Sequence, residues 1–114
     1  MTQHDDGIRL RHMLDHALEA VEMMRGRQRD DLKRDRILQL ALVRLVEIVG
    51  EAATRVSQEG QGRWPSIPWQ QARGMRNRLI HGYDKVDLDV LWDTIQDDLP
   101  ALIVQLREAL GQRG

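Results

Sequence analysis

The sequence contains no cysteine among its 114 residues. That absence excludes disulfide bonds, thiolate metal sites and cysteine nucleophiles together. The sequence also lacks any apolar run of the roughly 18 residues that a helix needs to cross a bilayer. Residues 1–6 are polar and acidic, without the basic start and apolar stretch of a secretory signal. We therefore expect a cytoplasmic protein that has no membrane partner, no metal and no other cofactor.

Net charge is also nearly absent, since 17 Lys and Arg residues face 18 Asp and Glu residues and give a formal charge of −1 at pH 7. Such a chain has no general attraction for nucleic acid, so any contact must come from a local patch. One cationic stretch stands out, and its members are Arg63, Arg73, Arg76, Arg78 and Lys85. An acidic stretch over residues 87–98 follows it.

The composition is 41% hydrophobic and 31% charged, which predicts one folded domain over residues 1–114. Apolar periodicity and helix-breaking residues predict four helices and no sheet. They are expected over about residues 5–25, 30–57, 68–82 and 87–110, with a loop over residues 58–67 that contains glycines and a proline.

The second expected helix is apolar around more than half of its circumference. This predicts that it is the central helix of a bundle, or that it also faces a second subunit. The last expected helix keeps its apolar stripe in phase across Pro100, which predicts one kinked helix rather than two separate ones. The predicted fold class is all-α, a four-helix bundle with a shorter third helix and a kinked last helix.

The end of the third expected helix carries a run of polar side chains. On a helix, Asn77 and His81 share a face that Arg78 borders. A histidine can take a proton from a ribose 2′-hydroxyl or give one to a 5′-oxygen, and an arginine can hold the phosphate. Arg76 and His81, however, lie about 140° apart around an ideal helix and about 7.5 Å apart along it. They could still pair within one chain, because arginine is long enough to curl around one turn and the helix is expected to unwind at His81 and Gly82. The alternative is that Arg76 of one subunit serves His81 of another.

Less specific interpretations stay open for these residues. His81 could be a cation that a helix C-terminus favours, without catalysis. Tyr83, the single tyrosine, could pack its ring on the end of the bundle. Glu51 could pair with a motif arginine or mark an ordinary polar edge. His12 and His16 have a spacing that can bind zinc, but no third ligand is evident and a solvent-facing pair is favoured.

Arg76 and Asn77, followed by His81 and Tyr83, resemble the R-x4-H-x-Y motif of HEPN toxins. The resemblance is specifically to the HepT-like branch, which is paired with MNT-type nucleotidyltransferase antitoxins. An R-x4-H match alone is weak, because such spacings arise by chance. Here the resemblance extends over most of the chain, and the similar segments are residues 48–53, 65–69, 74–77, 91–92 and 99–100.

The resemblance implies a helical HEPN bundle, usually a homodimer, with the motif arginine and histidine at a cleft between subunits. It implies a metal-independent endoribonuclease toxin of a type VII-like toxin–antitoxin pair, with RNA as substrate. The catalytic residues would be Arg76 and His81, with Asn77 as their polar partner. We add Arg78 and Glu51 as supporting residues of the same site.

The resemblance also implies a means of silencing, in which the partner antitoxin transfers AMP to Tyr83. A bulky anionic group two residues from His81 would block phosphate entry. Some HEPN proteins only bind nucleotides or RNA. The alternative function is therefore a non-catalytic module that binds a nucleotide or RNA, or that docks a partner.

Overall fold

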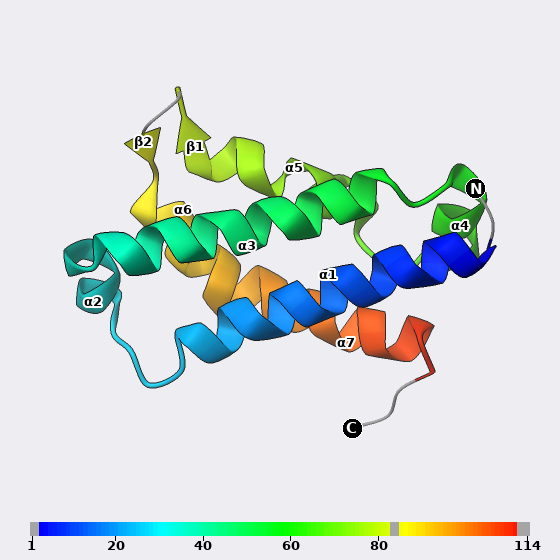
Figure 1. Ribbon diagram of the computed structural model, residues 1–114, viewed down its shortest axis with the longest axis horizontal. Coiled ribbons are helices and arrows are strands. Elements are labelled where there is room, and N and C mark those ends of the chain that lie inside the picture. The colour runs from blue at the N-terminus through cyan, green and yellow to red at the C-terminus, as the bar shows by residue number, and fades with distance from the viewer. Residues whose placement is uncertain (1–2, 83–84, 112–114) are drawn as a thin grey trace.

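The computed structural model describes residues 3–82 and 85–111, and it is almost entirely helical (Figure 1). The two longest helices, α1 (Gln3–Met23) and α3 (Arg36–Thr54), pack side by side. α5 (Trp69–Leu79) packs on α3, and α7 (Leu99–Ala109) packs on α1. The expected all-α bundle is confirmed, and α3 is the helix that lies between α1 and α5 (Figure 1).

The remaining elements are short and connect these helices. In chain order they are α2 (Arg29–Arg34), α4 (Gln58–Arg63), β1 (Ile80–His81), β2 (Lys85–Val86), α6 (Leu88–Asp93) and the π-helical turn η1 (Thr94–Asp98). In the part of the chain that the structure describes, no helix is both long and apolar enough to span a membrane.

The prediction of a single helix over residues 30–57 is wrong, because the helix is interrupted at Asp35. Its backbone leaves the helical region, with φ −112° and ψ 96°, and its carboxylate accepts a hydrogen bond from the Leu38 N–H at 3.0 Å. An aspartate in this position caps a new helix, so α2 ends and α3 begins. The Gln39 side chain closes the junction by donating to the Leu32 carbonyl at 2.9 Å.

The loop expected over residues 58–67 is also wrong in part, because it contains α4. The Ser57 hydroxyl caps this helix by accepting from the Gly60 N–H at 3.0 Å. Buried Asp6 accepts in turn from the Ser57 N–H at 2.9 Å and from its Oγ at 2.6 Å. Burial raises the pKa of Asp6, but these hydrogen bonds and the charge of Arg63 outweigh it and hold that pKa below its usual value.

The third helix ends earlier than expected. α5 stops at Leu79, and His81 lies in β1, where it pairs with Lys85 of the antiparallel strand β2. Gly82 follows with a φ of +74°, a left-handed conformation that favours glycine. The expectation that the helix unwinds near His81 is confirmed. The prediction that Asn77 and His81 share one helical face is therefore wrong.

Pro100 lies in the first turn of α7 without ending the helix. Just before it the backbone widens into η1, where the Leu99 N–H donates to the Thr94 carbonyl five residues earlier. A proline removes one backbone donor and crowds the preceding turn, and a π turn is one way to accommodate it. One continuous helical run from α6 to α7 results, so the apolar stripe belongs to one element as predicted.

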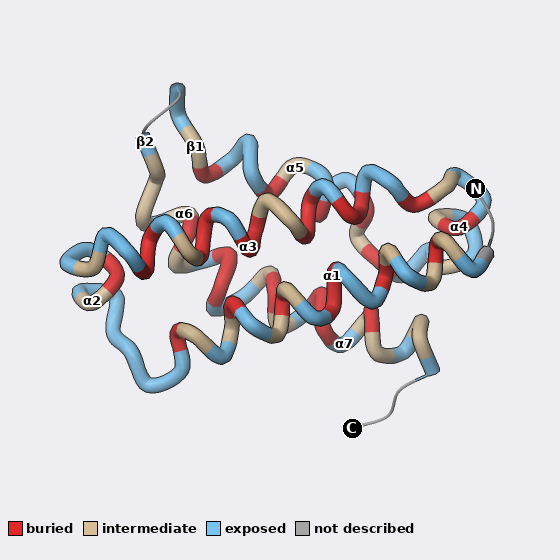
Figure 2. The backbone as a smooth tube through the Cα atoms, in the orientation of Figure 1, coloured by how far each residue is buried: buried red, intermediate tan, exposed pale blue. Residues whose placement is uncertain are grey.

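The core is one cluster of buried apolar residues. The buried positions lie on the sides of the helices that face one another (Figure 2). α5 approaches α3 closely at Gly50, where an added Cβ would lie 3.1 Å from the Ala72 carbonyl oxygen. Because glycine has no side chain, the two backbones can meet at this point. Met75 and Leu79 are then fully buried beneath α5.

Replacement of Gly50 by leucine is expected to lower the free energy of unfolding by about 1–3 kcal/mol, because the new side chain must push α5 from α3. Urea unfolding followed by circular dichroism measures the change. Gly74→Leu is the matched control within α5, since a Cβ there meets nothing within 4 Å. That variant should gain up to about 1 kcal/mol from helix propensity. Equal stability of the two variants would contradict a tight contact at Gly50.

Candidate functional site

Arg76 lies on the side of α5 that faces α3. Its Nε donates to Glu47 Oε2 of α3 at 2.6 Å, and the arginine side chain remains 52% exposed. A hydrogen bond between two charged groups is short and strong for its type, so this one fixes the guanidinium across the two helices. Glu51, for which we weighed such a pairing, instead contacts Arg55 at 3.4 Å on its own helix. Glu47 was not foreseen as the partner of Arg76.

A groove of about 410 Å³ separates α3 from α5 beside this ion pair. Arg76 and Asn77 both line it, so two of the predicted site residues share one surface. The other polar residues of the lining are Arg44, Glu47, Glu51, Thr54, Arg55 and Arg73. Four arginines and two glutamates make the groove a net cationic surface, suited to an anionic ligand.

Arg78 lies on a different side of α5. Its Nη2 donates to the Gln71 carbonyl at 3.3 Å and lies 4.0 Å from Asp98 Oδ2. Burial raises the pKa of Asp98 although Arg78 acts in the opposite direction. Arg78 lines a second groove, of about 530 Å³, and Asn77 borders both. The cationic stretch found in the sequence is therefore divided between two faces.

His81 is 62% exposed, and its Nε2 lies 3.6 Å from Asp87 Oδ2. Asp87 also caps α6 by accepting from the Val90 N–H at 3.1 Å. The hydrogen bond from Val90, and secondarily the contact with His81, lower the pKa of Asp87. A carboxylate in this place can orient the imidazole. The sequence indicated Asp87 only as a helix cap, because the β1–β2 hairpin that brings it to His81 was not predicted.

Within one chain, Arg76 and His81 have different partners. The guanidinium contacts Glu47 of α3, whereas the imidazole contacts Asp87 at the start of α6. His81 is not among the residues that line the α3/α5 groove. Tyr83 lies outside the described residues.

His12 and His16 lie one turn apart on α1, and His16 Nδ1 is 2.6 Å from the His12 carbonyl oxygen. Across residues 3–82 and 85–111, no three His, Asp or Glu side chains gather in a way that could hold a metal ion.

Comparison with known proteins places the chain in a family. Residues 13–109 match the family described as Ribonuclease HepT-like, and the chain belongs to this family. It is 35% identical over 101 residues to "Putative RNase TTE0752" of Caldanaerobacter subterraneus subsp. tengcongensis, covering 89% of this chain and 90% of that protein. It is 37% identical over 93 residues to "Probable ribonuclease HepT" of Thermococcus cleftensis, covering 78% and 84% respectively. No solved structure gives a significant match.

The contact of Arg76 with Glu47 can be measured by a double-mutant cycle of Arg76→Gln and Glu47→Gln. We expect a coupling of about 0.5–1 kcal/mol at low salt, because the pair is short but only partly buried. The coupling should fall at about 1 M salt, where exposed charges are screened. Arg55→Gln with Glu51→Gln is the control cycle, with an expected coupling of about 0.3 kcal/mol for an exposed helical pair. A zero coupling for Arg76 would contradict the contact.

Proposed function

We propose that this protein is a metal-independent endoribonuclease, the toxin of a type VII-like toxin–antitoxin pair. The observation that carries the proposal is an exposed His81 imidazole beside the Asp87 carboxylate, in a member of the HepT-like ribonuclease family. The names of its relatives, which call them RNases, support the same activity. The R-x4-H spacing from Arg76 to His81 adds the phosphate-binding group.

In the proposed reaction, His81 removes the proton of a ribose 2′-hydroxyl, and that oxygen attacks the adjacent phosphorus. The bond to the 5′-oxygen breaks, and the leaving oxygen takes up a proton. The products are a 2′,3′-cyclic phosphate and a free 5′-hydroxyl. Arg76 holds two phosphate oxygens and stabilises the charge that develops on them, and Asp87 orients the imidazole.

A second copy of the chain is part of the proposal. Within one chain Arg76 contacts Glu47 and His81 contacts Asp87, so we assign Arg76 from one subunit and His81 from the other to each site. Exposed apolar side chains on α3, Ile37 at 80% and Leu40 at 52%, are candidate contacts between the copies. A twofold dimer built in this way has two equivalent composite sites.

Mixing two inactive variants tests the composite site directly. Arg76→Ala and His81→Ala should each abolish cleavage of single-stranded RNA in EDTA. Unfolded and refolded together, they should recover about a quarter of the wild-type rate, because half of the dimers are mixed and each mixed dimer has one intact site. Gel analysis of labelled RNA measures the rate.

Three other results would revise this assignment. No recovery on mixing would place Arg76 and His81 of one chain in the same site. Full activity of His81→Ala would remove the histidine from the mechanism. Tight RNA binding by a wild-type protein that never cleaves would favour the alternative, a non-catalytic binding module.

We also propose that an MNT-type nucleotidyltransferase silences the toxin at Tyr83. The phenolic oxygen attacks the α-phosphorus of ATP, pyrophosphate leaves, and the phenolic proton is released. The added AMP carries negative charge two residues after His81, where it competes with RNA for Arg76. Support for this step comes from the R-x4-H-x-Y pattern, which includes Tyr83.

Incubation with the partner antitoxin and ATP should add at least one adenylyl group to the wild type and stop RNA cleavage. Tyr83→Phe should take up no AMP and should keep cleaving RNA, because the substitution removes only the nucleophilic oxygen. Intact-protein mass spectrometry measures the uptake. His81→Ala is the control, since it keeps Tyr83 and should be modified normally. Equal labelling of Tyr83→Phe would show that another residue accepts AMP.

A further inference from the structure

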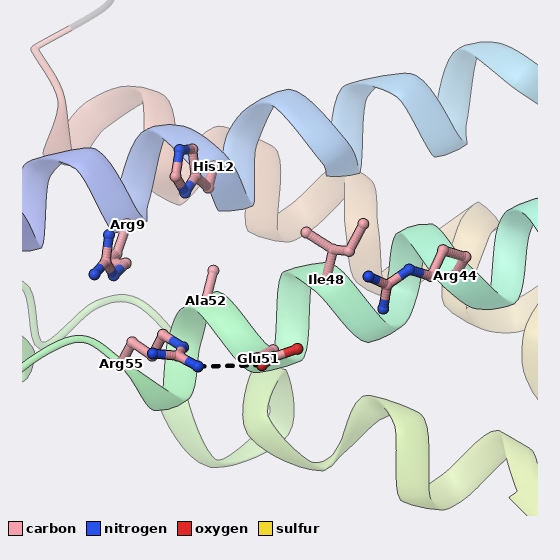
Figure 3. A pocket seen from close by; sticks show the side chains of 7 residues that line it. All are labelled: Arg9, His12, Arg44, Ile48, Glu51, Ala52 and Arg55. Atoms are coloured by element: carbon pink, nitrogen blue, oxygen red, sulfur yellow. Dashed lines mark hydrogen bonds and ion pairs between the residues drawn. The ribbon is translucent and has the colours of Figure 1, made fainter.

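A third groove, of about 450 Å³, runs between α1 and α3 (Figure 3). Arg9 and His12 reach it from α1, and Arg44 and Arg55 reach it from α3. Ile48, Glu51 and Ala52 complete its lining, with the two apolar side chains lying between Arg44 and Arg55 along the helix. None of the cationic residues here belongs to the R-x4-H motif.

Two of these arginines are not neutralised by the part of the protein that the structure describes. The Nε of Arg9 is buried and has no hydrogen-bond partner there. Arg44 is exposed and forms no ion pair within residues 3–82 and 85–111. A buried N–H without an acceptor is unfavourable, so Arg9 loses little if its side chain shifts to donate to a ligand in the groove that it lines.

The groove is positive although the whole chain is slightly negative. Its three arginines face one carboxylate, that of Glu51, which contacts Arg55 at 3.4 Å. A hollow lined by charge of one sign concentrates its field and attracts an anionic ligand. Phosphate groups fit this chemistry best, because a guanidinium can bind two of their oxygens at once.

The groove is continuous with the site of the proposed reaction. Arg44, Glu51 and Arg55 line both this groove and the α3/α5 groove, which Arg76 also lines. A ligand can therefore pass from α1 across the exposed ridge of α3 to Arg76. Arg44 and Arg55 are eleven residues apart, about 16 Å along the helix, so one phosphate cannot reach both.

We propose that the α1/α3 groove binds the phosphate backbone of the RNA substrate away from the cleaved bond. The proposal rests on the proposed function, because it assigns to the same substrate a path that leads to Arg76. Arg9 and Arg44 contact phosphates of different nucleotides toward opposite ends of the groove, and the apolar side chains of Ile48 and Ala52 contact the sugars or bases between them. A chain with a phosphate on every nucleotide satisfies both the length and the charge of the groove.

The affinity of fluorescein-labelled single-stranded RNA tests the path, measured by anisotropy in EDTA in the His81→Ala background, where RNA stays intact. Arg9→Gln and Arg44→Gln should each weaken binding roughly three- to tenfold, and each should reduce the slope of log K against log salt by about 0.7. Arg11→Gln on α1 and Arg36→Gln on α3 are the matched controls, exposed arginines outside this groove. These controls should change the affinity by less than about twofold.

Glu51→Gln provides a test of opposite sign. It removes the single carboxylate of the groove and releases Arg55, so RNA should bind about threefold more tightly. Because Arg9 and Arg44 have no ion-pair partner among the described residues, their variants should keep the thermal stability of the parent protein. A loss of affinity in those variants then reports on binding rather than on unfolding.

The outcomes separate this proposal from the proposed function. Equal losses in groove and control variants would overturn the path and leave only a general charge effect. A changed sedimentation coefficient of Arg44→Gln, with unchanged RNA affinity, would also overturn it and assign the groove to contacts between copies. If the wild type cleaves RNA but the groove variants bind RNA as tightly as their parent, the proposed function stands and the proposed RNA path is wrong. If the groove variants bind RNA more weakly but the wild type never cleaves, the path stands and the proposed function is wrong.

Discussion

The close contact between α3 and α5 at Gly50 is the constraint on which the candidate site depends. Because Gly50 has no side chain, the Ala72 carbonyl can approach α3, and one turn further along α5 Arg76 reaches Glu47. The groove beside that ion pair, with its surplus of arginines, is the space left between helices whose separation this contact determines. Backbone packing at one glycine thus determines the position of the cationic α3/α5 groove.

Much of the fold followed from the sequence, and the failures have a common cause. Apolar periodicity predicted an all-α bundle, and it predicted that helical structure continues across Pro100, as the structure shows through η1. The break at Asp35 was not predictable, because a capping aspartate looks like any other in an exposed charged run. The helix α4 depends on Asp6, which is 51 residues from Ser57, so no local pattern could indicate it.

For the candidate site, the sequence indicated residues but not the contacts around them. Arg76 and His81 were predicted as catalytic from their spacing and the resemblance around them, and that role stays a prediction. Glu47 and Asp87, which contact them, were not foreseen. Those contacts arise from helix packing and from the register of a hairpin, which a single sequence does not show. Because Arg76 and His81 have different partners within one chain, the proposed enzyme completes its reactive pair with a second copy of the chain.

The two hydrogen bonds that Ser57 donates to Asp6 also bear on the order in which the molecule can form. Both residues, and the whole of α1, α3 and α4, precede α5 in the chain. Domains begin to form during synthesis from the N-terminus, so this helical pair can close before the segment with Arg76 and His81 has emerged from the ribosome. The supporting framework of a proposed toxin can therefore form before its candidate reactive residues are free to pack on it.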